Sequence, residues 1–302
     1  MATPDAPALR NVSDTALWVA VYRAQESERP DALFHDPYAR RLAGERGARI
    51  AASATWMNQH AWSLVERTWL LDQIVMQEIA AGADMIINLA AGLDARPYRL
   101  DVPASLCWVE VDLPPLLAYK ESILAAAVPR CRLQRERCDL ADASARRRLF
   151  ERLGAEARRA LIVTEGLLIY LSAADAAALA RDLSAPPSFQ RWAFELAGPG
   201  LLRMMNGRSG SMGEEVARAG SPYRFAPAEG PAWFRPFGWQ PLAIHSPLRS
   251  ALRHHRLSWG MRLAALFSQS HPGHGRRPWS GICHMERMAI GDSIDGRGPL
   301  RA

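Results

Sequence analysis

Acidic side chains lie just beyond the ends of three successive predicted strands in the middle of the sequence. In an open parallel sheet, ligands bind outside the carboxyl ends of the strands, so we expect these acids to share one crevice. There a carboxylate can accept hydrogen bonds from a ribose diol or an amino group, or it can bind an ammonium group. The three acids are Asp112, Asp139 and Glu165.

A turn of small residues, Asn88–Asp94, precedes the first of these acids and suits the close approach of a ligand. Gly92 can adopt backbone angles closed to other residues, and Asp112 follows it by about the spacing of a nucleoside-binding sheet. This pattern fits both a nicotinamide dinucleotide and S-adenosylmethionine (SAM). The dinucleotide fingerprint G-x-G-x-x-G/A is incomplete, however, because Ala90 stands where its first glycine is needed.

The charges expected at the crevice distinguish the two cofactors. Three acids would repel the phosphates of a dinucleotide, whereas SAM carries an ammonium, a sulfonium and a ribose diol. Its single carboxylate needs a cation, and Arg67 in the preceding helical segment is the candidate for a bidentate contact. The alternative is that Arg67 only pairs with Glu66, Asp72 or another exposed acid, and that Asp94 only caps the next helix.

Short β-type segments alternate with helical segments between residues 82 and 197, which predicts a doubly wound α/β domain with a mostly parallel sheet. Ser172 and Asp175 form a capping-box pattern at the start of one helix. Segments 239–245 and 281–290 are expected to add an antiparallel pair at the sheet edge. The core strands are predicted at 85–89, 107–111, 132–136, 161–164 and 191–195, with helices at 114–128, 142–153 and 172–183.

Two segments outside this core are expected to cover the crevice. Residues 14–81 are predicted to form an N-terminal helical cap, and residues 198–238 a lid insertion, while 239–302 complete the sheet and include a helix at 249–267. Methionine and aromatic side chains in and near the insertion could wrap an aromatic substrate, and the alternative is that they only pack the lid. They are Met204, Met205, Met212, Tyr223, Phe225, Trp233 and Phe234.

The composition limits the class of protein. With 302 residues, 49% of them hydrophobic, the chain can bury a large core. The net charge is +6, but basic and acidic residues are interleaved, so no nucleic-acid surface is expected, and the run Arg146–Arg148 is interpreted as a solvated helix face. No apolar run is long enough to span a bilayer, and the start lacks an apolar signal core, so we expect a cytoplasmic protein.

Cysteine and histidine spacings do not predict a metal site. The four cysteines include no CxxC pair and are expected to be reduced. His271 and His274 fall in a polar segment, and Cys283 and His284 in a predicted strand, so we expect no bound metal.

Short motifs spread over nearly the whole chain resemble those of the leucine carboxyl methyltransferase family, a SAM-dependent group that includes bacterial polyketide O-methyltransferases of the tetracenomycin type. The motifs are Tyr22-Arg23-Ala24, Asp36-Pro37-Tyr38-Ala39, Glu66-Arg67-Thr68 with Asp72, Asn88 to Arg96, Glu110 to Pro114, Asp139-Leu140, Glu165 to Leu171 and Pro278 to Gly281.

The resemblance implies a Rossmann-like class I methyltransferase fold and a role for each predicted cofactor residue. The family often has glycine where Ala90 stands and threonine where Ala95 stands, so the turn is expected to sit slightly differently here. Tyr170 is expected near the transferred methyl group. The implied cofactor contacts are Arg67 with the SAM carboxylate, Ala90 and Gly92 in the turn beneath it, Asp112 with the ribose, Asp139 and the Leu140 backbone with the adenine, and Glu165 with the amino group.

The leading hypothesis is methylation of a carboxylate or hydroxyl oxygen of a small, aromatic, polyketide-like secondary metabolite. A protein C-terminal carboxyl methyltransferase is the second hypothesis, and a nicotinamide oxidoreductase or a nucleic-acid binder are distant ones. Methyl transfer needs no covalent residue, and only a hydroxyl acceptor would gain from a base, so no catalytic residue is assigned. Tyr170, Arg23 and His60 are the candidate acceptor-binding residues, while the oligomeric state is left open.

Overall fold

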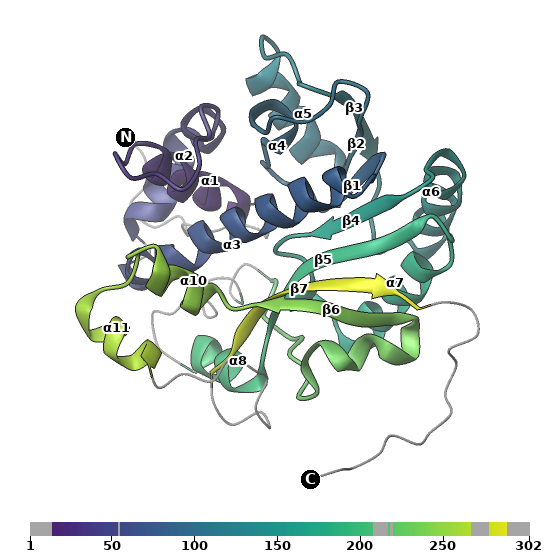
Figure 1. Ribbon diagram of the computed structural model, residues 1–302. Helices are drawn as coiled ribbons and strands as arrows, with labels where there is room; N and C mark the ends of the chain where they lie inside the picture. The colour runs from purple at the N-terminus through teal and green to yellow at the C-terminus, as the bar shows by residue number, and fades with distance from the viewer. Residues whose placement is uncertain (1–13, 54, 208–216, 218–219, 267–277, 289–302) are drawn as a thin grey trace.

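A seven-stranded sheet of order β3-β2-β1-β4-β5-β7-β6 forms the centre of the protein. The computed structural model describes residues 14–53, 55–207, 217, 220–266 and 278–288 (Figure 1). Strands β1 to β5 run parallel, and β7 pairs antiparallel with both β5 and β6. The strands are β1 (Met85–Leu89), β2 (Cys107–Asp112), β3 (Arg132–Arg137), β4 (Ala160–Thr164), β5 (Phe189–Ala197), β6 (Trp239–His245) and β7 (Ser280–Arg287).

The predicted doubly wound α/β fold is confirmed, including the antiparallel pair at the sheet edge. Strands β1, β2 and β4 are buried along their whole length, as expected for parallel strands with helices on both faces. The order reverses at β1, which lies between β2 and β4. Such a reversal places a crevice at the carboxyl ends of these strands.

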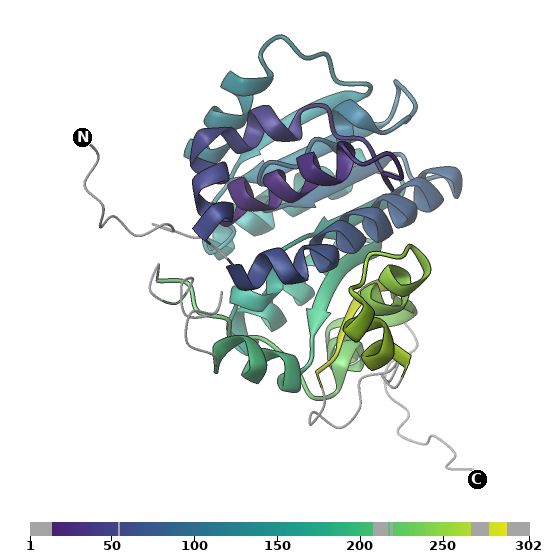
Figure 2. The same cartoon turned by 90° about the vertical axis from the view of Figure 1, so that its left-hand side faces the viewer.

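Helices cover both faces of the sheet. On one face, Leu71 and Val75 of α3 pack against Trp108 of β2, and Figure 2 shows α1, α2 and α3 side by side there. On the other face, helices α6 and α7 contribute Leu153 and Leu183 to a second core. The first seven helices are α1 (Asp14–Ser27), α2 (Ala39–Ser53), α3 (Thr55–Ala80), α4 (Arg96–Arg99), α5 (Pro114–Leu124), α6 (Ala143–Glu156) and α7 (Ala173–Ser184).

Two helix starts follow from local capping. Ser172 precedes α7, and its Oγ accepts a hydrogen bond from the backbone N–H of Asp175 at 3.1 Å, which confirms Ser172 as the N-cap of this helix. Asp142 caps α6 in the same way, because its Oδ1 accepts from the N–H groups of Ser144 and Ala145.

The N-terminal region differs from a continuous helical cap. Residues 28–38 between α1 and α2 are not helical, and Gly44 interrupts α2 with a φ of 56°. The predicted helix at 249–267 is likewise wrong as a single element. It is divided into α10 (Pro247–Arg253) and α11 (Trp259–Leu266), separated by His255 with a φ of 56°. The helix predicted at 114–128 ends at Leu124.

The segment predicted to be an insertion begins with helix α8 (Pro199–Asn206) and ends with the 3-10 helix η2 (Gly230–Phe237). A further 3-10 turn, η1 (Leu168–Tyr170), follows β4. Phe234 in η2 is fully buried against Trp192 of β5, so this end of the segment is part of the core rather than a cover. Met212, His271 and His274 lie outside the described residues.

The arginine run in α6 is not a uniformly solvated face. Arg147 and Arg148 are exposed, but Arg146 is buried. Its guanidinium donates to Asp182 of α7 and, at 2.6 Å, to the carbonyl oxygen of Leu140. The expectation for Arg146 was wrong because three consecutive residues of a helix point in different directions. Arg146 points toward the neighbouring helix α7.

Candidate functional site

The carboxyl ends of the central strands meet at one edge of the sheet. Leu89 of β1 is in register with Val111 of β2 and with Thr164 of β4, so the residues that follow these strands are neighbours. A cavity of about 900 Å³ opens at this edge. A volume of this size suits a cofactor together with a small substrate.

All ten residues predicted to bind cofactor or acceptor line this one cavity. Their individual roles remain predictions, but their convergence is a property of the fold. They are Arg23, His60, Arg67, Ala90, Gly92, Asp112, Asp139, Leu140, Glu165 and Tyr170.

Asp112 is fixed from both of its oxygens at the end of β2. Its Oδ2 accepts a hydrogen bond from the N–H of Gly92 at 2.7 Å, and its Oδ1 accepts from the N–H of Leu113 at 2.7 Å. Burial raises the pKa of the Asp112 carboxyl, while these two hydrogen bonds oppose the shift. Each oxygen keeps a lone pair for a ligand, which suits recognition of a diol.

The turn after β1 adopts a left-handed backbone at two positions. Ala90 has a φ of 52° and Gly92 a φ of 50°. This conformation costs an alanine about 1–2 kcal/mol but is open to glycine. A Cβ on Gly92 would also meet the Cβ of Ala16 in α1 at 3.4 Å, so the turn lies close against the N-terminal helix.

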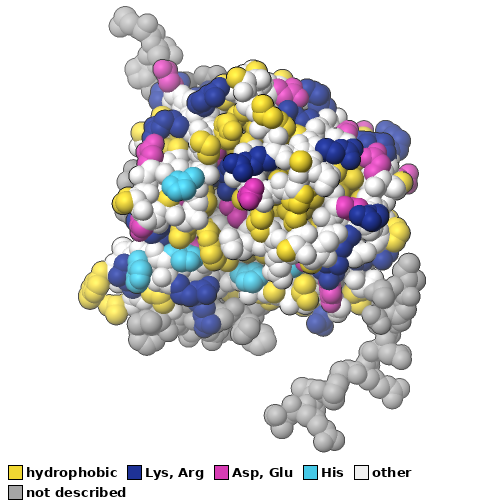
Figure 3. Space-filling model, turned by 45° about the horizontal axis from the view of Figure 1, so that its top comes forward, with side chains coloured by type: hydrophobic (Ala, Val, Ile, Leu, Met, Phe, Trp, Pro, Cys, Tyr) yellow, Lys and Arg dark blue, Asp and Glu magenta, His cyan; other side chains and the backbone are white. Residues whose placement is uncertain are grey.

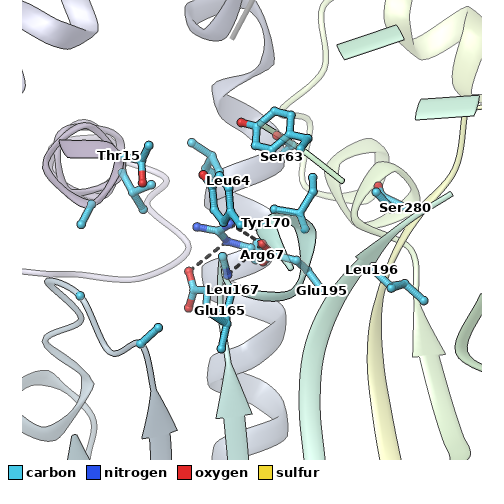
Figure 4. Close-up of a pocket in the computed structure, with 18 of the residues that line it drawn as sticks. Thr15, Ser63, Leu64, Arg67, Glu165, Leu167, Tyr170, Glu195, Leu196 and Ser280 are labelled. Carbon is cyan, nitrogen blue, oxygen red and sulfur yellow. Dashed lines mark hydrogen bonds and ion pairs between the residues drawn. The ribbon is translucent and has the colours of Figure 1, made fainter. Parts of the chain in front are cut away.

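Arg67 of α3 lies between two glutamates, as Figure 4 shows. Its Nε is 3.0 Å from Oε1 of Glu165, which follows β4, and its Nη1 donates to Oε1 of Glu195 in β5 at 2.9 Å. The alternative that Arg67 pairs with Glu66 or Asp72 is wrong. Both of those acids face away from it toward other partners.

Burial and charge act in opposite directions on these two glutamates. Burial raises the pKa of both carboxyls. For Glu165 the guanidinium groups of Arg96 and Arg67 prevail, and its pKa is lowered. For Glu195, Arg67 compensates only in part, and its pKa is raised. The two acids at neighbouring strand ends are therefore chemically different.

Arg96, which was not predicted as a site residue, organises the floor of the cavity. Its buried guanidinium binds Asp94 at 2.9 Å, Glu165 at 2.8 Å and Asp72 at 2.6 Å. Arg99 binds Asp72 as well, at 2.7 Å. Asp94 therefore forms part of an ion-pair network rather than only capping α4. Arg96 is the last residue of the motif that begins at Asn88. Its place in this motif is the sequence feature that could have predicted it as a site residue.

The loop after β3 forms the rim of the cavity at the opposite end. Asp139 is exposed, and its Oδ1 accepts from the N–H of Ala141 at 2.9 Å. Arg146 fixes the neighbouring Leu140 through its carbonyl oxygen. The backbone N–H of Leu140 and the Asp139 carboxylate are the polar groups predicted to face an adenine.

The acceptor candidates lie at the N-terminal helices and η1. The rings of Tyr170 and Tyr223 are 5.4 Å apart, and both residues line the cavity. Arg23 is already engaged, because it donates to Asp36 at 2.9 Å and to the Leu93 carbonyl oxygen at 2.6 Å. His60 lines the same cavity from α3.

The side chains expected to wrap a substrate divide into two groups. Met204, Met205, Tyr223 and Phe225 line the cavity, as expected. The expectation for Trp233 and Phe234 was wrong, because they pack against the core on the far face of the sheet. Their sequence positions close to Phe225 gave no sign of this difference.

Comparison with known proteins now identifies the family. Residues 16–184 match the family described as leucine carboxyl methyltransferase. The chain belongs to the leucine carboxyl methyltransferase family. A protein of Parafrankia sp. (strain EAN1pec), named as an S-adenosyl-L-methionine-dependent methyltransferase, is 37% identical over 261 residues, covering 78% of this chain and 79% of its own. A similarly named protein of Mycobacteroides abscessus is 34% identical over 230 residues, covering 71% and 70%.

Solved structures agree on the fold. A DUF574 family protein from Streptomyces avermitilis has a TM-score of 0.56 at 15% identity and covers 91% of this chain and 97% of its own. A protein from Thermobifida fusca named as a methyltransferase has a TM-score of 0.50 at 15% identity, covering 93% and 96%. The predicted fold class and the predicted SAM cofactor are thereby confirmed, and the nicotinamide alternative is set aside.

The cavity fits this cofactor. The Arg67 guanidinium and the Glu165 carboxylate present opposite charges 3.0 Å apart, which complements the carboxylate and ammonium of an amino acid. Asp112, on the strand between the rim and this pair, complements a ribose diol. In the same ordering along the sheet edge, the Asp139 rim after β3 lies beyond Asp112, on the side away from Glu165.

The charge pattern on one face and the apolar length of the described helices bear on the partners that the sequence left open. On the face shown in Figure 3, basic and acidic side chains are interspersed rather than gathered into a basic patch. None of the described helices is both long and apolar enough to cross a bilayer.

Proposed function

We propose that this methyltransferase transfers a methyl group from SAM to a carboxylate or hydroxyl oxygen of a small, aromatic, polyketide-like secondary metabolite. The observation that carries the proposal is the mixed lining of the cavity. Charged residues line the carboxyl ends of β1 to β4, whereas Leu201 and Met204 of α8, Phe225 and Trp279 contribute apolar surface. An apolar compartment beside a polar cofactor site suits an aromatic acceptor.

In this proposal the cofactor supplies an electrophilic methyl carbon on its sulfonium. The protein positions the acceptor oxygen against this carbon and excludes water from the cavity. Arg67 holds the carboxylate and Glu165 the amino group of the amino-acid portion. Asp112 holds the ribose hydroxyls, and Ala90 and Gly92 form the turn beneath it.

The adenine is held at the rim by Asp139 and the Leu140 backbone. Tyr170, Arg23 and His60 face the acceptor side. The apolar lining keeps water from competing with the acceptor oxygen.

The second candidate is methylation of the C-terminal carboxylate of a protein. The family name favours it, since the match covers residues 16–184 of a leucine carboxyl methyltransferase family. It requires that a peptide tail enter the cavity between α8 and the N-terminal helices. A tail peptide should then bind competitively with a small aromatic acceptor.

Isothermal titration with S-adenosylhomocysteine (SAH), the demethylated product, tests the cofactor site, with NADH as the control ligand. We expect micromolar binding of SAH and none of NADH. Acceptor screening with methyl-labelled SAM then compares small aromatic acids and phenols with a tail peptide. Methylation of the peptide alone would refute the small-molecule proposal.

A further inference from the structure

Glu195 occupies a position that the predicted cofactor contacts leave unexplained. Phe194 of β5 is in register with Thr164 of β4, so Glu195 and Glu165 follow paired residues and lie side by side. Along the sheet edge the predicted contacts run from adenine at β3, through ribose at β2, to the amino group at β4. Glu195, on β5, therefore lies one strand beyond the cofactor, on the acceptor side.

The two oxygens of Glu195 are not equivalent. Oε1 accepts hydrogen bonds from the N–H of Gly166 and from Arg67, both at 2.9 Å. Oε2 is buried and accepts no hydrogen bond from any residue that the structure describes. A buried carboxylate oxygen without a donor is unfavourable, so a ligand that brings a hydroxyl group satisfies it.

The groups around Glu195 do not favour an anionic ligand. Arg67 of α3 and Glu165 after β4 are the charged groups that face it, together with the phenols of Tyr170 in η1 and Tyr223. The rings of Tyr170 and Tyr223 lie 5.4 Å apart. The net effect of burial and of these neighbours is a raised pKa of the Glu195 carboxyl.

The cavity also lacks a cation available to an acceptor carboxylate, as far as the described residues show. No lysine lines it. In the proposed function Arg67 holds the cofactor carboxylate, and the other lining arginines each bind a carboxylate within the chain. The four arginines are Arg23, Arg67, Arg96 and Arg146. An acceptor carboxylate would therefore be desolvated next to Glu195 without a cationic partner from the chain, which is costly.

We propose that Glu195 selects a neutral hydroxyl acceptor, a phenol or alcohol, over a carboxylate and accepts the hydroxyl proton during methyl transfer. The inference rests on the proposed function and narrows it. The acceptor oxygen forms a bond to the methyl carbon while the bond from that carbon to sulfur breaks, and the electron pair of the broken bond stays on sulfur. The hydroxyl proton passes to the Glu195 carboxylate, which later releases it to water.

Binding to the SAH-loaded full chain tests the selection, with 2-naphthol and 2-naphthoate as matched neutral and anionic probes. Calorimetry at neutral pH should show that the wild-type protein binds 2-naphthol roughly tenfold more tightly than 2-naphthoate. Equal or tighter binding of 2-naphthoate overturns the proposal, and so does failure of both probes to bind. Failure of SAH itself to bind refutes the proposed function instead.

The variant Glu195→Gln separates the acceptor role from a structural one. Its amide oxygen can still accept from Gly166 and Arg67, while its NH2 group replaces Oε2 by a donor. We expect unchanged SAH affinity and loss or reversal of the preference for 2-naphthol. Weaker SAH binding by tenfold or more would assign Glu195 to the cofactor and overturn the proposal. Glu156→Gln, on the exposed end of α6, is the isosteric control.

Methyl transfer to bound 2-naphthol tests the proton-accepting role. The wild-type rate should rise with pH as Glu195 ionises, and Glu195→Gln should be slower by roughly a hundredfold and lose this pH dependence. Glu195→Asp, which keeps a carboxylate, should recover part of the rate. Equal rates in wild type and Glu195→Gln, or no transfer to bound 2-naphthol, would overturn this role.

Discussion

Arg67 and Glu165, which are predicted to hold the opposite charges of one amino-acid group, hold each other, with Nε 3.0 Å from Oε1. A ligand that carries an ammonium and a carboxylate therefore exchanges one internal ion pair for two intermolecular ones. Arg96 also binds Glu165, at 2.8 Å, so Glu165 would keep a cationic partner after such an exchange. If Arg67 and Glu165 hold the cofactor as proposed, we expect this arrangement to favour a zwitterion over a simple anion or cation.

The first prediction concerns the fork geometry of Arg67. The variant Arg67→Lys keeps the positive charge but cannot contact a carboxylate with two parallel donors. We expect its SAH affinity to fall by about 1.5–3 kcal/mol, the range for a charge-assisted hydrogen bond. Isothermal titration measures this change, and circular dichroism checks that the fold is retained. An affinity equal to that of the wild type would remove Arg67 from the cofactor site.

The second prediction concerns Asp112, whose two oxygens are held by Gly92 and Leu113. Asp112→Ala removes the partner of the ribose diol and should weaken SAM binding by about 1–3 kcal/mol. Asp112→Asn keeps the shape of the side chain but loses one acceptor, so it should lie between wild type and Asp112→Ala. Titration with both SAH and adenosine tests the assignment. If Asp112→Ala lost affinity and Asp112→Asn did not, the loss would come from the turn at Gly92, which Asp112 holds, rather than from the contact with the diol.

The elements at the sheet edge could be predicted because each depends on local pattern. The buried runs of β1 and β4 and the N-cap at Ser172 are encoded in a few adjacent residues. The convergence of Asp112 and Glu165 then follows from parallel topology alone. Glu195 had the same signal, a polar residue in a predicted strand, but its pairing with Glu165 depends on the register of β4 with β5.

The side chains that the sequence did not place correctly have partners that lie far away in sequence. Arg96 binds Asp72, which lies 24 residues earlier, and Arg146 binds Asp182 on a neighbouring helix. Phe234 resembles a lid residue in sequence, yet it packs against Trp192 behind the sheet. No periodicity within a single element specifies such contacts, because they are set by how helices and strands pack.

The third prediction uses the left-handed backbone of Ala90. Ala90→Gly removes an unfavourable alanine conformation worth about 1–2 kcal/mol, against about 0.4–1 kcal/mol of added flexibility in the unfolded chain. We expect a net gain of about 0–1.6 kcal/mol, read as a slightly higher Tm. Ala91→Gly, next in the chain and without a positive φ, is the control and should lower the stability. A destabilised Ala90→Gly would mean that the alanine methyl contributes packing that outweighs its strain.

The fourth prediction concerns the single lysine of the chain. Lys120 is fully buried, and its Nζ is 2.7 Å from Oε1 of Glu110, which also binds Arg135 at 3.0 Å. Lys120→Met leaves Glu110 with one cation fewer in a buried setting and should cost about 2–4 kcal/mol in the free energy of unfolding. Urea denaturation measures the loss. The double variant Lys120→Met with Glu110→Gln should recover part of it, and a loss below about 0.5 kcal/mol would show that Arg135 alone satisfies Glu110.

The last prediction concerns stability in acid and rests on Glu78 in the last turn of α3. Burial by itself raises the pKa of Glu78, but hydrogen bonds and charges of His284, Arg159 and Arg191 prevail and lower it from 4.5 to about 2. Because the pKa in the folded state lies below that of the unfolded chain, this stabilisation is fully present above about pH 5. It is lost as the pH falls from there toward 2.

The variant Glu78→Gln tests this dependence. It should be less stable than the wild type at pH 7 by about 1–2 kcal/mol, a value reduced by solvent screening, and the difference should shrink as the pH approaches 2. Thermal or urea unfolding at pH 7, 5, 4 and 3 gives the comparison. Glu156→Gln, at an exposed ion pair with Arg152, is the control and should show little change at any of these pH values. A difference for Glu78→Gln that stayed constant down to pH 3 would mean that the amide disturbs packing rather than removing a titrating charge.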